Sequence, residues 1–147
     1  MSEKDFDLIC IGRSCVDLYS GEFGVPLERA MTFTKSVGGS PMNIAIGPSR
    51  LGLRVGAITG VGQEDNGRYL KWQLSCEGVD VSAVKTDPKR LTAMVLLSIR
   101  GDNDFPLIQY RENCADMGLT AEDIEPDYLA RAGAVLVTGT HLSREPA

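Results

Sequence analysis

The sequence is poor in the residues that build metal sites. It holds a single histidine, His141, and its four cysteines include no Cys-x-x-Cys pair. Structural zinc sites take four Cys or His ligands, commonly in closely spaced pairs, so a Cys/His zinc site is nearly excluded. Cys10 lies in an apolar run and is expected to be a small buried hydrophobe. For His141 we expect a packing or surface position.

The sequence also lacks an excess of positive charge and a long apolar run. Its 15 Lys and Arg against 20 Asp and Glu give a net charge of -5, which argues against a nucleic-acid or anionic-membrane partner. No segment approaches the roughly 20 apolar residues that span a bilayer, and no signal-peptide core follows the charged N-terminus. We therefore expect a protein of the reducing cytoplasm whose partners are small molecules or other protein chains.

What the sequence does contain is an alternation of apolar runs and amphipathic segments. Four segments predict, in order, a buried strand, a helix closed by Gly52, a second buried strand and an amphipathic helix closed by Gly78. This order predicts a parallel α/β sheet with right-handed crossovers. The segments are Phe6–Val16, Pro41 to about Leu51, Val55–Val61 and Asp65–Glu77.

Two β-prone parts interrupt this alternation. Residues Met31–Val37 predict an exposed strand, and Thr92–Arg100 with Leu107–Arg111 predict a β-hairpin with a long loop. Further along, the pattern predicts a helix opened by a capping box, another buried strand and the start of a last helix. These three begin at Thr120, span Ala134–Thr138 and begin at Ser143.

A glycine-rich turn joins the exposed strand to the first helix. Gly38 and Gly39 precede Ser40 and Pro41, a good N-cap and a good first helical residue. Adjacent glycines before a helix let the backbone approach a ligand closely and point N–H groups at it. Asn43, one turn into the helix, offers amide donors and an acceptor that suit a sugar hydroxyl. A turn of purely structural use is the alternative that the glycines alone leave open.

The complete pattern around this turn resembles the first signature of the PfkB family, the carbohydrate kinases related to ribokinase. The Gly-Gly-x-Pro-x-Asn-x-Ala core at residues 38–45 and the later glycines Gly52 and Gly62 fall at the family's spacing. Residues 61–67 resemble the family's continuation, Val-Gly-x-Asp-x-x-Gly, with one extra residue before the aspartate. The resemblance extends over essentially the whole chain.

Within the family, the stretches 12–19, 32–41 and 109–116 are similar to kinases of keto-deoxy sugar acids. The resemblance implies that the intact protein uses ATP and Mg²⁺ to phosphorylate 5-dehydro-2-deoxy-D-gluconate to its 6-phosphate, in inositol catabolism. Kinases of 2-keto-3-deoxygluconate are similar in the same region, and ribose and fructose remain alternative substrates. Ribokinases carry Asn where this chain has Cys15, which speaks against ribose.

The resemblance also implies a fold and a division of the chain. The fold is an α/β ribokinase-like three-layer sandwich, present in part, with a small β-sheet lid built from insertions at about residues 18–37 and 92–113. In relatives the lid closes over the substrate, excludes water and often forms the dimer contact, so we expect a homodimer through the lid. Residues 1–147 would form the N-terminal part of the kinase domain, with the C-terminal ATP-binding half absent.

Four of the substrate-binding residues that the resemblance implies lie in the first third of the chain. Asp17, expected at the end of the first strand, would hydrogen-bond substrate hydroxyls. Gly38, Gly39 and Asn43 would close around the same sugar. An aspartate that ends an apolar strand needs such a partner to offset its desolvation.

The other two implied residues, Tyr110 and Arg111, lie on the hairpin and would reach the carboxyl or keto end of the substrate, which a guanidinium fork suits. The chain lacks the family's second signature, Asp-Thr-x-Gly-Ala-Gly-Asp, which carries the general-base aspartate and the anion hole. No catalytic residue is therefore assigned. We expect the 147-residue chain alone to be inactive.

Two other classes of protein compete with the kinase. A dinucleotide-binding oxidoreductase would need Gly-x-Gly-x-x-Gly after the first strand, where this chain has Gly12-Arg13-Ser14-Cys15, so this class is disfavoured. A non-catalytic binding or dimerisation module stays open for the chain by itself, because the family's catalytic aspartate is missing from it.

Overall fold

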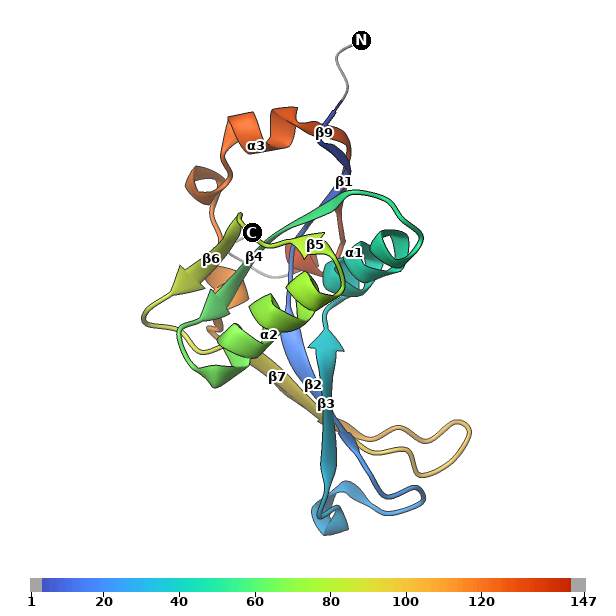
Figure 1. Ribbon diagram of the computed structural model, residues 1–147. Coiled ribbons are helices and arrows are strands. Elements are labelled where there is room, and N and C mark those ends of the chain that lie inside the picture. The colour runs from blue at the N-terminus through green and yellow to red at the C-terminus, as the bar shows by residue number, and fades with distance from the viewer. Residues whose placement is uncertain (1–3, 144–147) are drawn as a thin grey trace.

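The computed structural model describes residues 4–143, which form two β-sheets (Figure 1). The first, the central sheet, has five strands that all pair in parallel. Its order is β5-β4-β1-β9, and β6 pairs with the carboxyl half of β4. The strands are β1 (Phe6–Ile11), β4 (Val55–Gly62), β5 (Val79–Asp80), β6 (Val84–Asp87) and β9 (Ala132–Val137).

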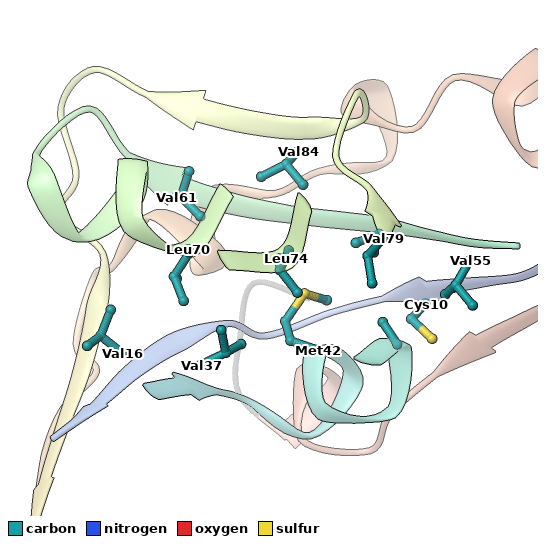
Figure 2. Packing of buried hydrophobic residues seen from close by; sticks show 12 residues of the cluster. Cys10, Val16, Val37, Met42, Val55, Val61, Leu70, Leu74, Val79 and Val84 are labelled. Atoms are coloured by element: carbon teal, nitrogen blue, oxygen red, sulfur yellow. The ribbon is translucent and has the colours of Figure 1, made fainter. Parts of the chain in front are cut away.

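One face of the central sheet is covered by α1 (Ser40–Arg50) and α2 (Asp65–Cys76), close to the helices expected from the sequence. Their apolar stripes meet the strands in a continuous core, in which Met42, Leu70 and Leu74 are fully buried (Figure 2). Both helices therefore hold their place through a buried stripe.

The opposite face carries shorter helices: η2 (Ala115–Gly118), η3 (Ala121–Asp123) and α3 (Pro126–Ala130). Leu119 and Tyr128 from this layer pack against Ile9 of β1 and Ile58 of β4. The layers thus follow the predicted α/β sandwich, with one face of β1 and β4 turned to each helical layer.

The second sheet projects away from the central sheet (Figure 1). Its order is β3-β2-β7-β8, with a parallel pair in the middle and antiparallel pairs outside. The predicted exposed strand and the predicted hairpin are both found in it. Its strands are β2 (Cys15–Ser20), β3 (Phe33–Gly38), β7 (Ala93–Leu97) and β8 (Leu107–Tyr110), and η1 (Leu27–Arg29) lies between β2 and β3.

The prediction of one strand over Phe6–Val16 is wrong. The chain leaves the central sheet at Gly12, which has a φ of 143°, and enters the second sheet at Cys15. Cys15 and Val16 at the start of β2 are apolar, so the sequence prediction joins them to the first strand across Gly12, Arg13 and Ser14. As a result Asp17 lies inside β2 and not at the end of the first strand.

The strand expected near residue 134 exists as β9, but it is not buried. Val135 and Val137 are 48% and 49% exposed, because within residues 4–143 β9 is an edge strand that pairs with β1 alone.

The segment at Thr120 opens a 3₁₀ turn and not a full helix, although the capping box is formed. At the carboxyl end η4 spans His141–Ser143, and the last predicted helix falls mainly on residues outside the described range. None of the described helices has the length and apolarity to cross a membrane.

Candidate functional site

The candidate site is built around the turn Gly12–Ser14, where the chain passes from the central sheet to the second sheet. Thr59 Oγ1 donates to Ser14 Oγ (2.9 Å), which donates to the carbonyl oxygen of Gly60 (3.2 Å). Both hydroxyl groups belong to fully buried residues. These bonds fix the turn to β4, so β2 starts from a rigid point.

The adjacent glycines of the sequence motif pack directly against this turn. Gly39 has a φ of 95°, and a Cβ on it would lie 2.4 Å from the carbonyl oxygen of Arg13. A Cβ on Gly38 would lie 2.2 Å from Asp17 Oδ1. Gly39 is therefore required by the backbone, whereas Gly38 is required because the Asp17 carboxylate rests on it.

The Asp17 carboxylate is half-buried and lies against Gly38. Cys15 Sγ donates to Asp17 Oδ1 (3.3 Å). Burial raises the pKa of Asp17, while the bond from Cys15 and the charge of Arg111 act in the opposite direction. Burial, with the charge of Asp17, raises the pKa of Cys15 to about 12, so Cys15 is a neutral thiol at pH 7. A carboxylate in this setting has lone pairs available for the hydroxyl groups of a ligand.

Arg111 follows β8 and brings a positive charge to the same region. Its side chain is 15% exposed, and its Nη2 lies 3.7 Å from Oδ2 of the fully buried Asp116. The same oxygen accepts a hydrogen bond from Nε of Arg13. Nε and Nη2 of Arg111 have no hydrogen-bond partner among the described residues. Two donors of the guanidinium are therefore buried and unsatisfied within the described residues, and a guanidinium suits carboxylate or keto oxygens.

The register of the second sheet decides which residues share a face with Asp17. Residues that pair directly across neighbouring strands point to the same face. Asp17 pairs with Val95, and Val95 pairs with Gln109. Tyr110 pairs with Met94 and so points to the opposite face, where its side chain is 53% exposed. Burial raises the pKa of Asp17 and the charge of Arg111 opposes this rise, whereas Tyr110 lies on the other face of the sheet.

Asn43 stands in the first turn of α1 and is exposed. It lines a cleft of about 480 Å³ at the β3 edge, together with Ser36 and Tyr19. By register, Ser36 and Tyr19 lie on the Asp17 face of the second sheet. Asn43 is thus placed at the border of the site and not at its centre.

A second cleft, of about 710 Å³, lies where β7 and β8 meet the start of α2. Tyr110 and Arg111 line it together with Glu64. Glu64 accepts the backbone N–H of Thr92 (3.1 Å), and Thr92 Oγ1 accepts the backbone N–H of Gly62 (2.9 Å), so this cleft borders the point where the hairpin leaves the core.

Sequence reasoning missed Arg13, Asp116 and Gln109. Arg13 and Asp116 form a buried pair across 103 positions of sequence, and such a pairing leaves no local pattern. Gln109 shares the face of Asp17 only through the pairing of three strands, which the sequence does not show.

His141 lies behind the turn, where a Cβ on Gly12 would be 3.3 Å from His141 Cβ. Burial lowers the pKa of His141, and the charge of Arg13 lowers it further against the opposing effect of Asp116. The imidazole is therefore neutral at pH 7. Across residues 4–143, no group of three or more His, Cys, Asp or Glu side chains could hold a metal ion.

A parallel central sheet between helices, a projecting four-stranded sheet and a glycine pair beneath an aspartate define a ribokinase-like fold. Solved structures agree with this class. A sugar kinase from Pyrococcus horikoshii, in complex with ATP, is 34% identical and matches 95% of this chain and 45% of its own length with a TM-score of 0.87. A fructokinase from Halothermothrix orenii is 31% identical, with a TM-score of 0.82 over 95% of this chain and 49% of its own length.

The family follows from the sequence match. Residues 5–146 match the model of the pfkB family carbohydrate kinases, and the chain belongs to this family. Among curated proteins, the 5-dehydro-2-deoxygluconokinase of Geobacillus kaustophilus is 42% identical over 98% of this chain and 43% of its own length. That of Listeria monocytogenes is 39% identical over 99% and 45%. The chain thus spans less than half the length of these relatives.

Proposed function

We propose that the complete protein containing this chain transfers a phosphoryl group from ATP to a hydroxyl group of a sugar acid, 5-dehydro-2-deoxy-D-gluconate. The observation that carries the proposal is the half-buried Asp17 carboxylate that lies against Gly38, within the electrostatic influence of Arg111. A carboxylate accepts from sugar hydroxyls, and a guanidinium with free donors binds a carboxylate or keto group. The printed names of the relatives support this substrate.

Each expected site residue has a part in the proposal. Asp17 would orient the hydroxyl groups, and the backbone at Gly38 and Gly39 would let the sugar approach closely. Asn43 would close the open border from α1, and Arg111 would bind the acid end. For Tyr110, contact with the substrate needs a different orientation of β8.

ATP and Mg²⁺ belong to the proposal for the complete protein. The described residues do not supply a cluster of acidic side chains that would hold Mg²⁺, so no step of phosphoryl transfer is assigned to them. We place the ATP site and the general base in the part of the relatives' length that this chain does not cover. The 147-residue chain by itself would then bind sugar without turnover.

The proposal further includes a cytoplasmic homodimer that forms through the second sheet. Apolar side chains of that sheet and its loops are exposed, among them Phe23, Phe33, Phe105 and Ile108. Their burial against a second copy would be favourable at about 25 cal/mol per Å² of apolar surface. The four cysteines are free, as in proteins of a reducing compartment. Light scattering on an Ile108→Glu variant would show a monomer if this surface forms the dimer, and an unchanged mass would contradict it.

The substrate proposal is tested by measuring ADP release by the complete protein with a panel of sugars. We expect the highest kcat/KM with 5-dehydro-2-deoxy-D-gluconate. 2-Keto-3-deoxygluconate is the nearest alternative because it carries the same chemical groups. A preference for ribose or fructose, which lack the carboxylate, would contradict the role given to Arg111. A Tyr110→Phe variant with a raised KM would show the contact that the present orientation of β8 does not make.

A further inference from the structure

A buried group of charges at the junction of the two sheets reaches beyond the proposed substrate contacts. Asp116, on η2, is fully buried, and its Oδ2 accepts from Arg13 Nε and from the backbone N–H of Ser14 (3.3 Å). The same oxygen lies 3.7 Å from Arg111 Nη2. One carboxylate oxygen of Asp116 therefore lies near two arginines, Arg13 and Arg111, which are far apart in the sequence.

The hydrogen bonds of this group are incomplete. Within the described residues, Asp116 Oδ1, Arg13 Nη2 and Nε and Nη2 of Arg111 are buried without a partner. Leaving buried polar groups unpaired is unfavourable, because they have lost water without gaining a partner. A small shift of the Arg111 guanidinium toward Asp116 would satisfy several of them at once, and hydrogen bonds at binding sites commonly tighten when the ligand arrives.

The three charges are anchored differently. Ser14 is hydrogen-bonded to β4, and a Cβ on Gly60 of β4 would lie 2.3 Å from the carbonyl oxygen of Ala115, so η2 packs directly on this strand. Asp116 and Arg13 thus belong to the rigid core of the central sheet. Arg111 follows the hairpin of the second sheet and has no hydrogen bond to Asp116, from which its Nη2 is 3.7 Å away.

We propose that Asp116 is a positioning residue: it orients the Arg111 guanidinium toward Asp17, and Arg13 is the buried counter-charge that holds Asp116 in place. The inference rests on the proposed function, since it describes how the site holds the arginine that binds the acid end of the sugar. A purely structural ion pair between Arg13 and Asp116 is the alternative. The two differ in whether the effect of Asp116 on binding passes through Arg111.

A double-mutant cycle on the complete enzyme separates them. We expect Asp116→Asn to raise the KM for the sugar acid by about 10- to 100-fold, with a smaller change in kcat, because a misplaced positioning group costs rates of this order. Arg111→Met should raise it similarly, and the double variant should be no worse than Arg111→Met alone. Asp104→Asn, which breaks an exposed pair with Arg100 on the same hairpin, is the matched control and should leave the KM unchanged.

A second variant covers the case that Asp116→Asn does not fold. Arg13→Met combined with Asp116→Leu replaces the buried pair by apolar side chains, an exchange that folds are known to tolerate. It should unfold near the wild-type temperature but keep the raised KM. A wild-type KM in this variant, or effects of Asp116→Asn and Arg111→Met that multiply in the double variant, would overturn the positioning role. A wild-type enzyme that phosphorylates no sugar acid would overturn the proposed function itself.

Discussion

An alanine substitution should affect the two adjacent glycines differently: at Gly39 it should lower stability, and at Gly38 it should weaken sugar binding. A methyl group on Gly39 would lie 2.4 Å from a backbone oxygen and would also be held at a φ of 95°. A methyl group on Gly38 would lie 2.2 Å from Asp17 Oδ1, the end of a side chain that can rotate. Gly39→Ala should therefore destabilise the fold, whereas Gly38→Ala should displace the Asp17 carboxylate within the site.

The magnitudes follow from these contacts. A left-handed residue with a Cβ costs about 1–2 kcal/mol, and the backbone clash adds to it, so Gly39→Ala should lower the free energy of unfolding by at least about 2 kcal/mol. Gly38→Ala should lower it by less than Gly39→Ala does, because the atoms that a Cβ on Gly38 would displace belong to a side chain that can rotate. Turning the Asp17 carboxylate away loses charged hydrogen bonds of about 1.5–3 kcal/mol, which is about a 10- to 100-fold weaker affinity for the sugar.

Urea unfolding and calorimetric titration of the sugar acid measure the two effects separately. Gly101→Ala is the matched control, because a Cβ there meets no atom within 4 Å and should alter neither quantity. The reasoning is refuted if Gly38→Ala binds the sugar like the wild type. It is equally refuted if both glycine variants lose stability to the same extent.

Three further predictions concern the frame of the site. Hydrogen bonds from Lys89 and Arg90 outweigh burial and hold the pKa of Asp87 at about 2, so its stabilising effect should fade as the pH falls from 3.8 toward 2; urea midpoints across this range should drop less in Asp87→Asn. Leu74→Ala should cost about 2–5 kcal/mol in urea unfolding, because Leu74 is fully buried between α2 and the sheet. In the native chain, a maleimide should label one thiol rapidly, that of the exposed Cys76, since the other three cysteines are buried; labelling of a second thiol at a similar rate would show that the core opens.

The sequence predicted most elements of this fold because each has a local cause. The period of the apolar residues identifies α1 and α2, and Pro41 lies in the first turn of α1 as expected. The predicted N-cap is wrong, because Ser40 is the first residue of α1 and Gly39 precedes it without a side-chain cap. The change of sheet at Gly12 could not be predicted this way, because a positive φ is not visible in the sequence and apolar residues resume at Cys15 after Arg13 and Ser14. The exposure of β9 was equally hidden, since burial depends on which layers pack on a strand and not on its composition.

Only part of the candidate site could be predicted from residue types and their spacing. The glycine pair and Asp17 were predicted through the resemblance to the kinase family. The Arg13–Asp116 pair does not, because its partners meet only when η2 packs beneath β4. Tyr110 and Arg111 are neighbours in sequence, but β8 ends at Tyr110, and its register places Tyr110 on the face away from Asp17. The sequence motif contains both residues, so the motif alone does not show which of the two side chains faces the site.

The strand pairing of the second sheet connects the two charged residues of the candidate site, Asp17 and Arg111. The parallel pairing of β2 with β7 joins the strand of Asp17 to the hairpin that leads to Arg111. Movement of this sheet as one body would preserve the relation between Asp17 and Arg111 and would change the distance from Arg111 to Asp116, which belongs to the central layer. The 3.7 Å gap between Arg111 and Asp116 is therefore the contact that such a movement would close or open. If Arg111 binds the acid end of a sugar as proposed, its position would then depend on the position of the second sheet.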